Sequence, residues 1–215
     1  MAAQLTTADA AALLSAVAAE LIAAKDDLTQ LDAALGDGDL GRTIERGFTA
    51  VRDGLQTSTE TDLGRLLFQQ GKAFNTAAAS SFGTLFSTLL QKSGQALKDK
   101  PAAALPELVD ALQTAADTVK ERGKAEVGDK TMLDALYPAL TAMRAALAQP
   151  MPPTLAALLR AGADAADQGA AQTKAMQSQI GRASWKGERS VGHEDPGARA
   201  IALMLAAAAR WAEGQ

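Results

Sequence analysis

Three aspartates within a short stretch are the side chains best suited to chemistry in this sequence. Asp37 and Asp39 are separated only by Gly38, so in an extended segment both side chains point the same way. Asp32 precedes them, and a turn at Gly36 can bring it alongside. Three converging carboxylates repel one another strongly unless a cation lies among them. Oxygen ligands without histidine or cysteine favour Mg²⁺, Mn²⁺ or Ca²⁺, so this stretch predicts a divalent-cation site.

The residues that follow the aspartates fit a phosphate beside that cation. Gly41 begins a predicted helix and Thr43 lies in its first turn. A helix N-terminus next to a divalent cation is a favourable place for a phosphate. A solvated, glycine-rich turn would explain the same residues without a ligand, and the aspartates alone leave both interpretations open. An EF-hand fits poorly, because Arg42 and Phe48 stand where that loop needs glycine and glutamate. No Walker A sequence is present either.

Two further loops carry small or charged residues ahead of a helix. In the segment Ser80-Ser81-Phe82-Gly83-Thr84 the hydroxyls could hold a phosphate, although helix capping is their commoner role. The segment Gly128 to Met132 enters another predicted helix, where Asp129 could act as the N-cap. Lys130 in that segment is expected to be solvated.

A third loop contains arginines and the single histidine. Arg182 and Arg189 flank Trp185, and an arginine beside an anion site can neutralise a transferring phosphoryl group. Each arginine taken singly fits an ordinary surface residue as well. His193 lies just before Glu194, and hydrogen bonding or capping fits it better than catalysis.

Composition excludes several classes of function. The 215 residues include no cysteine and one histidine, which excludes disulfides, thiolate metal sites, cysteine nucleophiles and histidine-rich metal sites. A net charge of −4 and 4% aromatic residues give no general attraction to nucleic acid or anionic lipid and few platforms for stacking bases. No signal peptide and no apolar run long enough to span a membrane is evident, so the expected location is the cytoplasm.

Apolar spacing is helical almost throughout and predicts a single all-α domain over residues 1–215. The segments expected to position the loops described above are helices at about 7–31, 41–54, 61–78, 81–98, 104–121, 131–148, 153–177 and 197–213. Prolines at 101, 150, 152 and 153 mark several of the joints. No strand with period-two alternation is evident.

These loops, taken in order, resemble one family. The matching stretches are Leu31-Asp32 through Gly36-Asp37-Gly38-Asp39, Gly83 to Phe86, Val127 to Leu136, Gly181 to Ser190 and Gly192 to Ala198. They resemble the nucleotide-binding L subunit of dihydroxyacetone kinase, the DhaL or DAK2 domain, which also forms the C-terminal domain of single-chain dihydroxyacetone kinases. The resemblance covers about residues 10 to 210.

The resemblance implies a barrel of eight antiparallel up-and-down helices with ADP or ATP bound at one end. It implies that Asp32, Asp37 and Asp39 chelate two Mg²⁺ ions and that Arg182 contacts phosphate. Further nucleotide contacts would come from Leu40-Gly41-Arg42-Thr43, from Ser80-Ser81-Phe82, and from Gly128 and Asp195-Pro196-Gly197.

The same resemblance implies partner proteins. The keto-sugar would be bound covalently to a histidine of a separate K-type subunit. The phosphoryl donor would be either exchanging ATP or a phosphotransferase-system protein that rephosphorylates bound ADP. The sequence leaves a homodimer open.

Two positions depart from the usual family pattern. Leu40 stands where the family usually has histidine, and Phe82-Gly83-Thr84 replaces a Ser-Gly-Pro turn. Leucine and phenylalanine side chains donate no hydrogen bonds, so contacts to phosphate here would have to come from backbone N–H groups.

Three hypotheses follow from the sequence. The first is a phosphotransferase subunit that binds Mg²⁺ and ADP or ATP and passes a phosphoryl group to dihydroxyacetone or a related keto-sugar. The second is a non-catalytic regulatory module that keeps the fold and the nucleotide site. The third, a helical interaction protein without nucleotide, leaves the three aspartates without a common purpose.

Overall fold

The computed structural model describes residues 4–215, so the first three residues of the predicted domain lie outside it. The described part is predominantly α-helical, as expected. Its helices are α1 (Thr7–Ala23), α2 (Lys25–Leu35), α3 (Leu40–Gln56), α4 (Leu63–Ala77), α5 (Ser81–Ala96), α6 (Leu105–Gly123), α7 (Leu133–Leu147), α8 (Leu155–Gln172) and α9 (Pro196–Glu213). Two 3-10 segments, η1 (Thr173–Ala175) and η2 (Arg182–Ser190), lie between α8 and α9.

The first predicted helix, 7–31, is wrong as a single element. The chain breaks at Ala24, and α2 leaves α1 at an angle of 60°. Neither glycine nor proline marks the break. Asp26 and Asp27 lie in the first turn of α2, where the helix dipole stabilises acidic side chains, and this favours a new helix N-terminus there. The break matters because α2 carries Asp32.

The structure also contains two short strands that no alternating pattern in the sequence indicated. β1 (Gln4–Thr6) pairs antiparallel with β2 (Ala102–Ala104) in a two-stranded sheet, with Leu5 opposite Ala103. Both strands have only three residues, too few for alternation to be recognised. Their pairing joins segments that are far apart in the chain, which local sequence patterns do not report.

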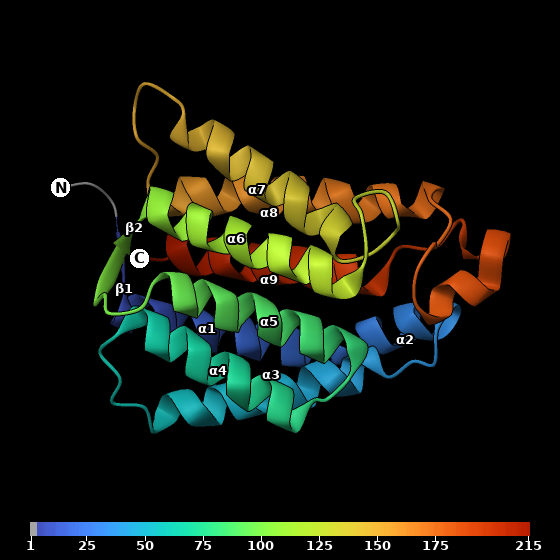
Figure 1. Cartoon of the computed structure of the whole chain (residues 1–215), viewed down its shortest axis with the longest axis horizontal. Coiled ribbons are helices and arrows are strands. Elements are labelled where there is room, and N and C mark those ends of the chain that lie inside the picture. The colour runs from blue at the N-terminus through green and yellow to red at the C-terminus, as the bar shows by residue number, and fades with distance from the viewer. Residues whose placement is uncertain (1–3) are drawn as a thin grey trace.

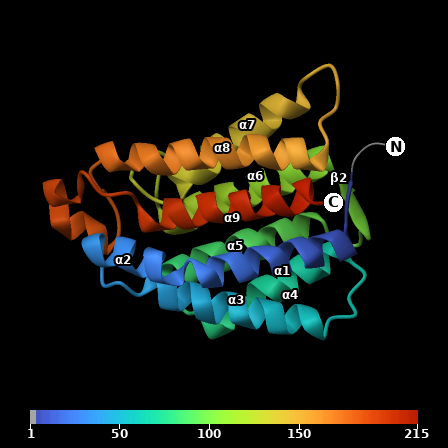
Figure 2. The same cartoon turned by 180° about the vertical axis from the view of Figure 1, so that it is seen from behind.

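Most helices lie side by side along the long axis of the molecule, and successive connections lie at opposite ends (Figure 1). From α3 to α9 each helix packs against the next, α9 packs against α1, and α1 packs against α3. The sheet and the C-terminus lie at one end, while α2 and the α8–α9 connection lie at the other (Figures 1 and 2). The second of these ends is called the loop end below.

Several helices begin at a side chain that caps their free N–H groups. Thr6 and Asp9 form a capping box at α1, which confirms the start expected at about residue 7. Asp62, Thr154 and Asp195 cap α4, α8 and α9. These caps explain why the observed starts lie within two residues of the predicted ones.

The interior is apolar and includes a group of phenylalanines below the loop end. The rings of Phe48, Phe74 and Phe86 lie with centroids 4.9–5.5 Å apart, and Phe82 stacks on Phe86 at 6.0 Å. Aromatic pairs at these separations add to the stability gained from burial. Phe82 thus has a packing role that needs no ligand.

No single helix among residues 4–215 has the length and apolar character to cross a membrane, although α1 and α2 together, bent as they are, pass that test by length and composition.

Candidate functional site

The three aspartates converge at the loop end. Each of Asp32, Asp37 and Asp39 offers a carboxylate oxygen, and these oxygens all lie within 4.8 Å of one another. Asp32 comes from α2, whereas the other two come from the connection to α3. Gly38 between them has φ of +71°, in the left-handed region that favours glycine. The predicted convergence is confirmed, and the oxygen-only donor set fits a hard divalent cation.

Backbone hydrogen bonds hold this connection against α2. The N–H of Gly36 donates to the backbone oxygen of Asp32 at 2.6 Å, and the N–H of Leu40 donates to Oδ2 of Asp32 at 3.2 Å. The side chain of Leu40 is buried in the core. Leu40 therefore serves packing with its side chain and orients Asp32 with its N–H.

A close approach between α2 and α3 sets the position of Asp32. A Cβ added at Gly41 would lie 2.0 Å from Oγ1 of Thr29 and 2.1 Å from the backbone oxygen of Lys25. Contacts this short cannot be relieved by a side-chain rotation alone, because one of the atoms is backbone. Gly41, predicted to approach phosphate, is buried in this helix contact.

Substitution of Gly41 by alanine is therefore expected to destabilise the protein. We expect the free energy of unfolding to fall by about 3 kcal/mol, at the upper end for overpacking. Gly123→Ala is the matched control, because its Cβ would meet nothing closer than 3.7 Å. Urea denaturation of both variants measures the difference, and equal stabilities would contradict the close approach.

Arg182 reaches the aspartates from a distant segment of the chain. Its guanidinium hydrogen-bonds to Oδ2 of Asp37 and lies 3.7 Å from Oδ2 of Asp39. The two segments are far apart in the chain, and the contact joins η2 to the α2–α3 connection. A positive group thus offsets part of the carboxylate repulsion in the ligand-free protein.

A cavity opens beside this cluster, and most of the predicted site residues line it. The predicted residues in its wall are Asp32, Asp37, Asp39, Leu40, Ser80, Ser81, Phe82, Arg182, Asp195, Pro196 and Gly197. Predicted residues outside the wall are Gly41, Arg42, Thr43 and Gly128. Other residues complete the wall, among them Leu35, Leu85, Ile180 and Lys130, the last of which was expected to be solvated. The cavity combines a carboxylate cluster with apolar walls.

Ser80 caps α5, the role that the sequence favoured. Its Oγ accepts a hydrogen bond from the N–H of Gly83 at 3.0 Å. Ser81 begins the helix, is exposed and lines the cavity. The N–H groups of this first turn are the part of the segment that can face an anion.

The segment before α7 differs from expectation. Asp129 does not cap that helix; its carboxylate accepts from the N–H of Glu126 at 2.7 Å. Instead, the buried carboxylate of Asp134 accepts from Gly128 and Thr131, at 2.5 and 2.7 Å. A carboxylate inside the first turn can fold the preceding loop back onto the helix in this way.

Burial raises the pKa of Asp195 to about 7. Asp134 and Asp32 raise this pKa as well, while the N–H of Ala198 and the ammonium of Lys130 lower it. The carboxyl of Asp195 caps α9 by accepting from Ala198 at 2.7 Å. The titration of this residue is thus shifted from its ordinary acidic range toward neutrality.

Because the folded-state pKa is raised above the unfolded value of 3.8, folding takes up a proton at Asp195 between about pH 4 and pH 7. The stability that this group contributes is fully present below pH 4 and is lost as the pH rises toward 7. Asp195→Asn keeps a capping oxygen but does not titrate. We expect the stability of the wild type, relative to this variant, to decrease across that window in urea denaturation of nucleotide-free protein. Parallel profiles would contradict the shift.

Comparisons with known proteins show the family to which the chain is similar. The DAK2 domain family matches residues 34–210. The chain is 37% identical over 178 residues to the "PEP-dependent dihydroxyacetone kinase, ADP-binding subunit DhaL" of Escherichia coli K12, covering 83% of this chain and 84% of that protein. It is 34% identical to the D-erythrulose kinase of Mycolicibacterium smegmatis, covering 87% of this chain and 32% of that enzyme.

A solved structure resembles this one as well. It is the dihydroxyacetone kinase of Citrobacter freundii in complex with AMP-PNP and Mg²⁺, with a TM-score of 0.72 and 33% identity. The match covers 93% of this chain and 33% of the other. The chain thus spans most of one relative and about a third of the two longer kinases.

Proposed function

The chain belongs to the DAK2 domain family, and on that premise we propose that it is the nucleotide-binding subunit of a kinase that phosphorylates dihydroxyacetone or a related small keto-sugar. The observation that carries this proposal is the convergence of Asp32, Asp37 and Asp39 with Arg182 in the wall of one cavity. The names of the relatives, an ADP-binding subunit and an enzyme with AMP-PNP and Mg²⁺, support the same ligands.

We propose that the three aspartates hold two Mg²⁺ ions. When bound, Mg²⁺ supplies positive charge that neutralises phosphate oxygens and fixes their position. The carboxylates repel one another without it, so they favour the loaded state of the site.

Arg182 would donate to phosphate oxygens. Its guanidinium already stands beside Asp37 and Asp39, so a small rotation of a half-exposed side chain suffices to reach a neighbouring anion. Planar, bidentate donation to phosphate is a strength of arginine. N–H groups at the start of α5 and the apolar wall at Phe82 and Ile180 would complete the nucleotide site.

The acceptor sugar would be bound elsewhere. His193 is exposed, and phosphoryl transfer relies mainly on positioning and charge neutralisation rather than on a base from this chain. We propose that a K-type subunit presents the keto-sugar to the loop end. Exposed apolar side chains occur at that end, including Trp185 with 84% of its surface accessible, and they suit a protein partner.

The proposal extends to the architecture and to the donor. The order of helix packing supports a closed barrel of eight helices in which α2 extends α1 beyond the ring. The phosphoryl donor is either ATP that exchanges at each turnover or a phosphotransferase-system protein that recharges bound ADP. The PEP-dependent relative favours testing the second route alongside the first.

Reconstitution tests the function. The purified protein is combined with a K-type subunit, dihydroxyacetone and Mg²⁺, and is supplied with either ATP or phosphoenolpyruvate plus phosphotransferase-system proteins. Formation of the sugar phosphate is the expected result, and the donor that supports it identifies the route. Binding of Mg²⁺ and ADP without transfer from either donor would favour the non-catalytic regulatory module instead.

A further inference from the structure

Lys130 lies beneath the proposed nucleotide site and is almost fully buried, with 2% of its surface accessible. Its backbone has φ of +63°, a left-handed conformation that is uncommon for a residue with a side chain. Burial lowers the pKa of its ammonium, while the carboxyl of Asp195 raises it. A lysine in such surroundings is costly unless its charge is well solvated by the protein, so its hydrogen bonds decide what it does.

The ammonium of Lys130 is bound entirely by backbone oxygens. Nζ donates to the backbone oxygen of Met176 at 3.1 Å, to that of Ser190 at 2.5 Å and to that of His193 at 2.6 Å. An ammonium group has three N–H donors, and here all three are used. Lys130 therefore has no donor left for a phosphate in the cavity, although it lines the wall.

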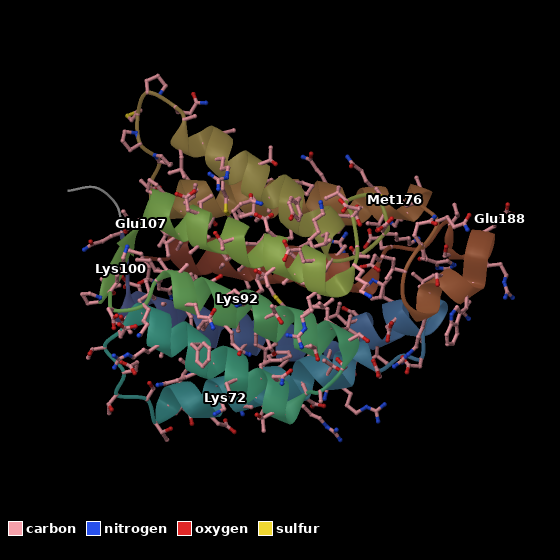
Figure 3. The ribbon with its side chains drawn as sticks, viewed as in Figure 1. Lys72, Lys92, Lys100, Glu107, Met176 and Glu188 are labelled. Carbon is pink, nitrogen blue, oxygen red and sulfur yellow. The ribbon has the colours of Figure 1, made fainter. Side chains whose placement is uncertain are left out.

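The three acceptors all belong to the connection between α8 and α9, residues 173–195, which we call the arginine segment because it carries Arg182. Met176 precedes η2, Ser190 is its last residue, and His193 follows it. The ammonium thus joins the two sides of the base of the segment. Figure 3 shows Met176 and Glu188 of this segment at the loop end, far from Lys100 and Glu107 at the opposite end.

Other hydrogen bonds close the same base. The N–H of Ser178 donates to Oγ of Ser190 at 2.9 Å, and the N–H of Gly192 donates to the backbone oxygen of Lys174 at 2.7 Å. Ser178 and Ser190 are buried with Lys130. The base is therefore a buried polar network with a cation at its centre. Its backbone N–H groups and the ammonium of Lys130 are paired, whereas Oγ of Ser178 has no hydrogen-bond partner. Hydrogen bonds in such a buried, low-dielectric setting are strong and hold the bonded atoms in place.

The tip of the arginine segment is different. Arg182 and Trp185 are exposed there, and the tip reaches the rest of the site through the contacts of Arg182 with Asp37 and Asp39. These contacts must rearrange if a nucleotide enters. The buried base then remains to keep the arginine over the carboxylates.

We propose that Lys130 is a positioning residue for the nucleotide site, which fixes the base of the arginine segment so that Arg182 stands over the aspartate cluster. Its effect on nucleotide affinity rests on the proposed function, whereas its hold on the segment does not. Because all three donors of its ammonium are used within the segment, Lys130 acts through Arg182.

The test compares Lys130→Met with Lys130→Arg and with Leu66→Ala. Leu66 is buried in a separate apolar cluster with Leu5 and Ala103 of the sheet, so its truncation lowers stability without touching the segment. Hydrogen exchange at the amides of Ser178 and Gly192 reports the base directly, and calorimetry reports the affinity for Mg²⁺–ADP. Should Lys130→Met fail to fold, Lys130→Gln, which keeps two donors, takes its place in the same measurements.

We expect Lys130→Met to speed exchange at both amides and to weaken Mg²⁺–ADP binding, each by about tenfold or more, the scale of hydrogen bonds to a charged group. Lys130→Arg should recover part of both losses, and Leu66→Ala should change neither. Unchanged exchange and affinity in Lys130→Met would overturn the proposal, as would an equal loss of affinity in Leu66→Ala. If the wild type binds no nucleotide, the proposed function fails, and the exchange measurement still decides whether Lys130 holds the segment.

Discussion

Asp32→Asn is expected to abolish most of the Mg²⁺-dependent binding of ADP and to leave the ligand-free protein at least as stable as the wild type. The substitution is isosteric, and its amide oxygen can still accept from the N–H of Leu40. Both contacts of Arg182 remain, since they are made to Asp37 and Asp39. Only a charge is removed, so the repulsion within the cluster falls while a metal ligand is lost.

The magnitude follows from the loss of one partner in a close charge interaction. We expect the dissociation constant for Mg²⁺–ADP to rise by about a hundredfold or more. Calorimetric titration measures this affinity, and thermal melting in EDTA measures the stability of the ligand-free protein. Asp27→Asn on the same helix is the matched control, because this substitution removes the same charge from a residue outside the cluster. Equal affinities for the two variants would contradict the metal assignment.

Arg182→Ala is expected to produce effects of opposite sign on metal binding and on phosphoryl transfer. The guanidinium occupies the space beside Asp37 and Asp39 in the ligand-free protein, so it competes with a cation for these carboxylates. Its removal should tighten the binding of Mg²⁺ alone. The rate of transfer to the keto-sugar should fall by about a thousandfold, the lower range for an arginine that stabilises a transferring phosphoryl group.

A lysine at position 182 separates the effect of charge from that of geometry. Arg182→Lys keeps a cation but loses the planar fork of the guanidinium. Compared with Arg182→Ala, we therefore expect it to restore the competition with Mg²⁺ for the carboxylates more fully than the rate of phosphoryl transfer. Arg189→Ala is the matched control, because it removes an exposed arginine from the same segment that does not line the cavity. Steady-state rates in the reconstituted kinase provide the measurement. A wild-type rate for Arg182→Ala would remove this arginine from the mechanism.

The periodicity of apolar residues predicted most helices well, because these helices are long and amphipathic or begin at a capping side chain. It failed at Ala24, where no glycine or proline marks the break and acidic residues after it favour a new helix. It gave no sign of β1 and β2, whose pairing depends on contacts between distant segments. Features of these two kinds depend on tertiary packing rather than on local sequence.

The carboxylate cluster was predictable because Asp37 and Asp39 are close in sequence and a turn at Gly36 can bring Asp32 alongside them. The part played by Gly41 was not, since its contact with Thr29 depends on how α2 crosses α3. Lys130 was expected to be solvated, and its burial follows only from the path of the arginine segment across it.

The most direct test of the proposed function is a calorimetric titration of nucleotide-free protein with ADP, carried out with Mg²⁺ and again with EDTA. The structure predicts binding of one ADP per chain that requires Mg²⁺. At a hundredfold excess over the dissociation constant, this binding should stabilise the protein by about 2.7 kcal/mol. Absence of binding in Mg²⁺, or equal binding in EDTA, would contradict the assignment of Asp32, Asp37 and Asp39 as the metal-holding core of a nucleotide site.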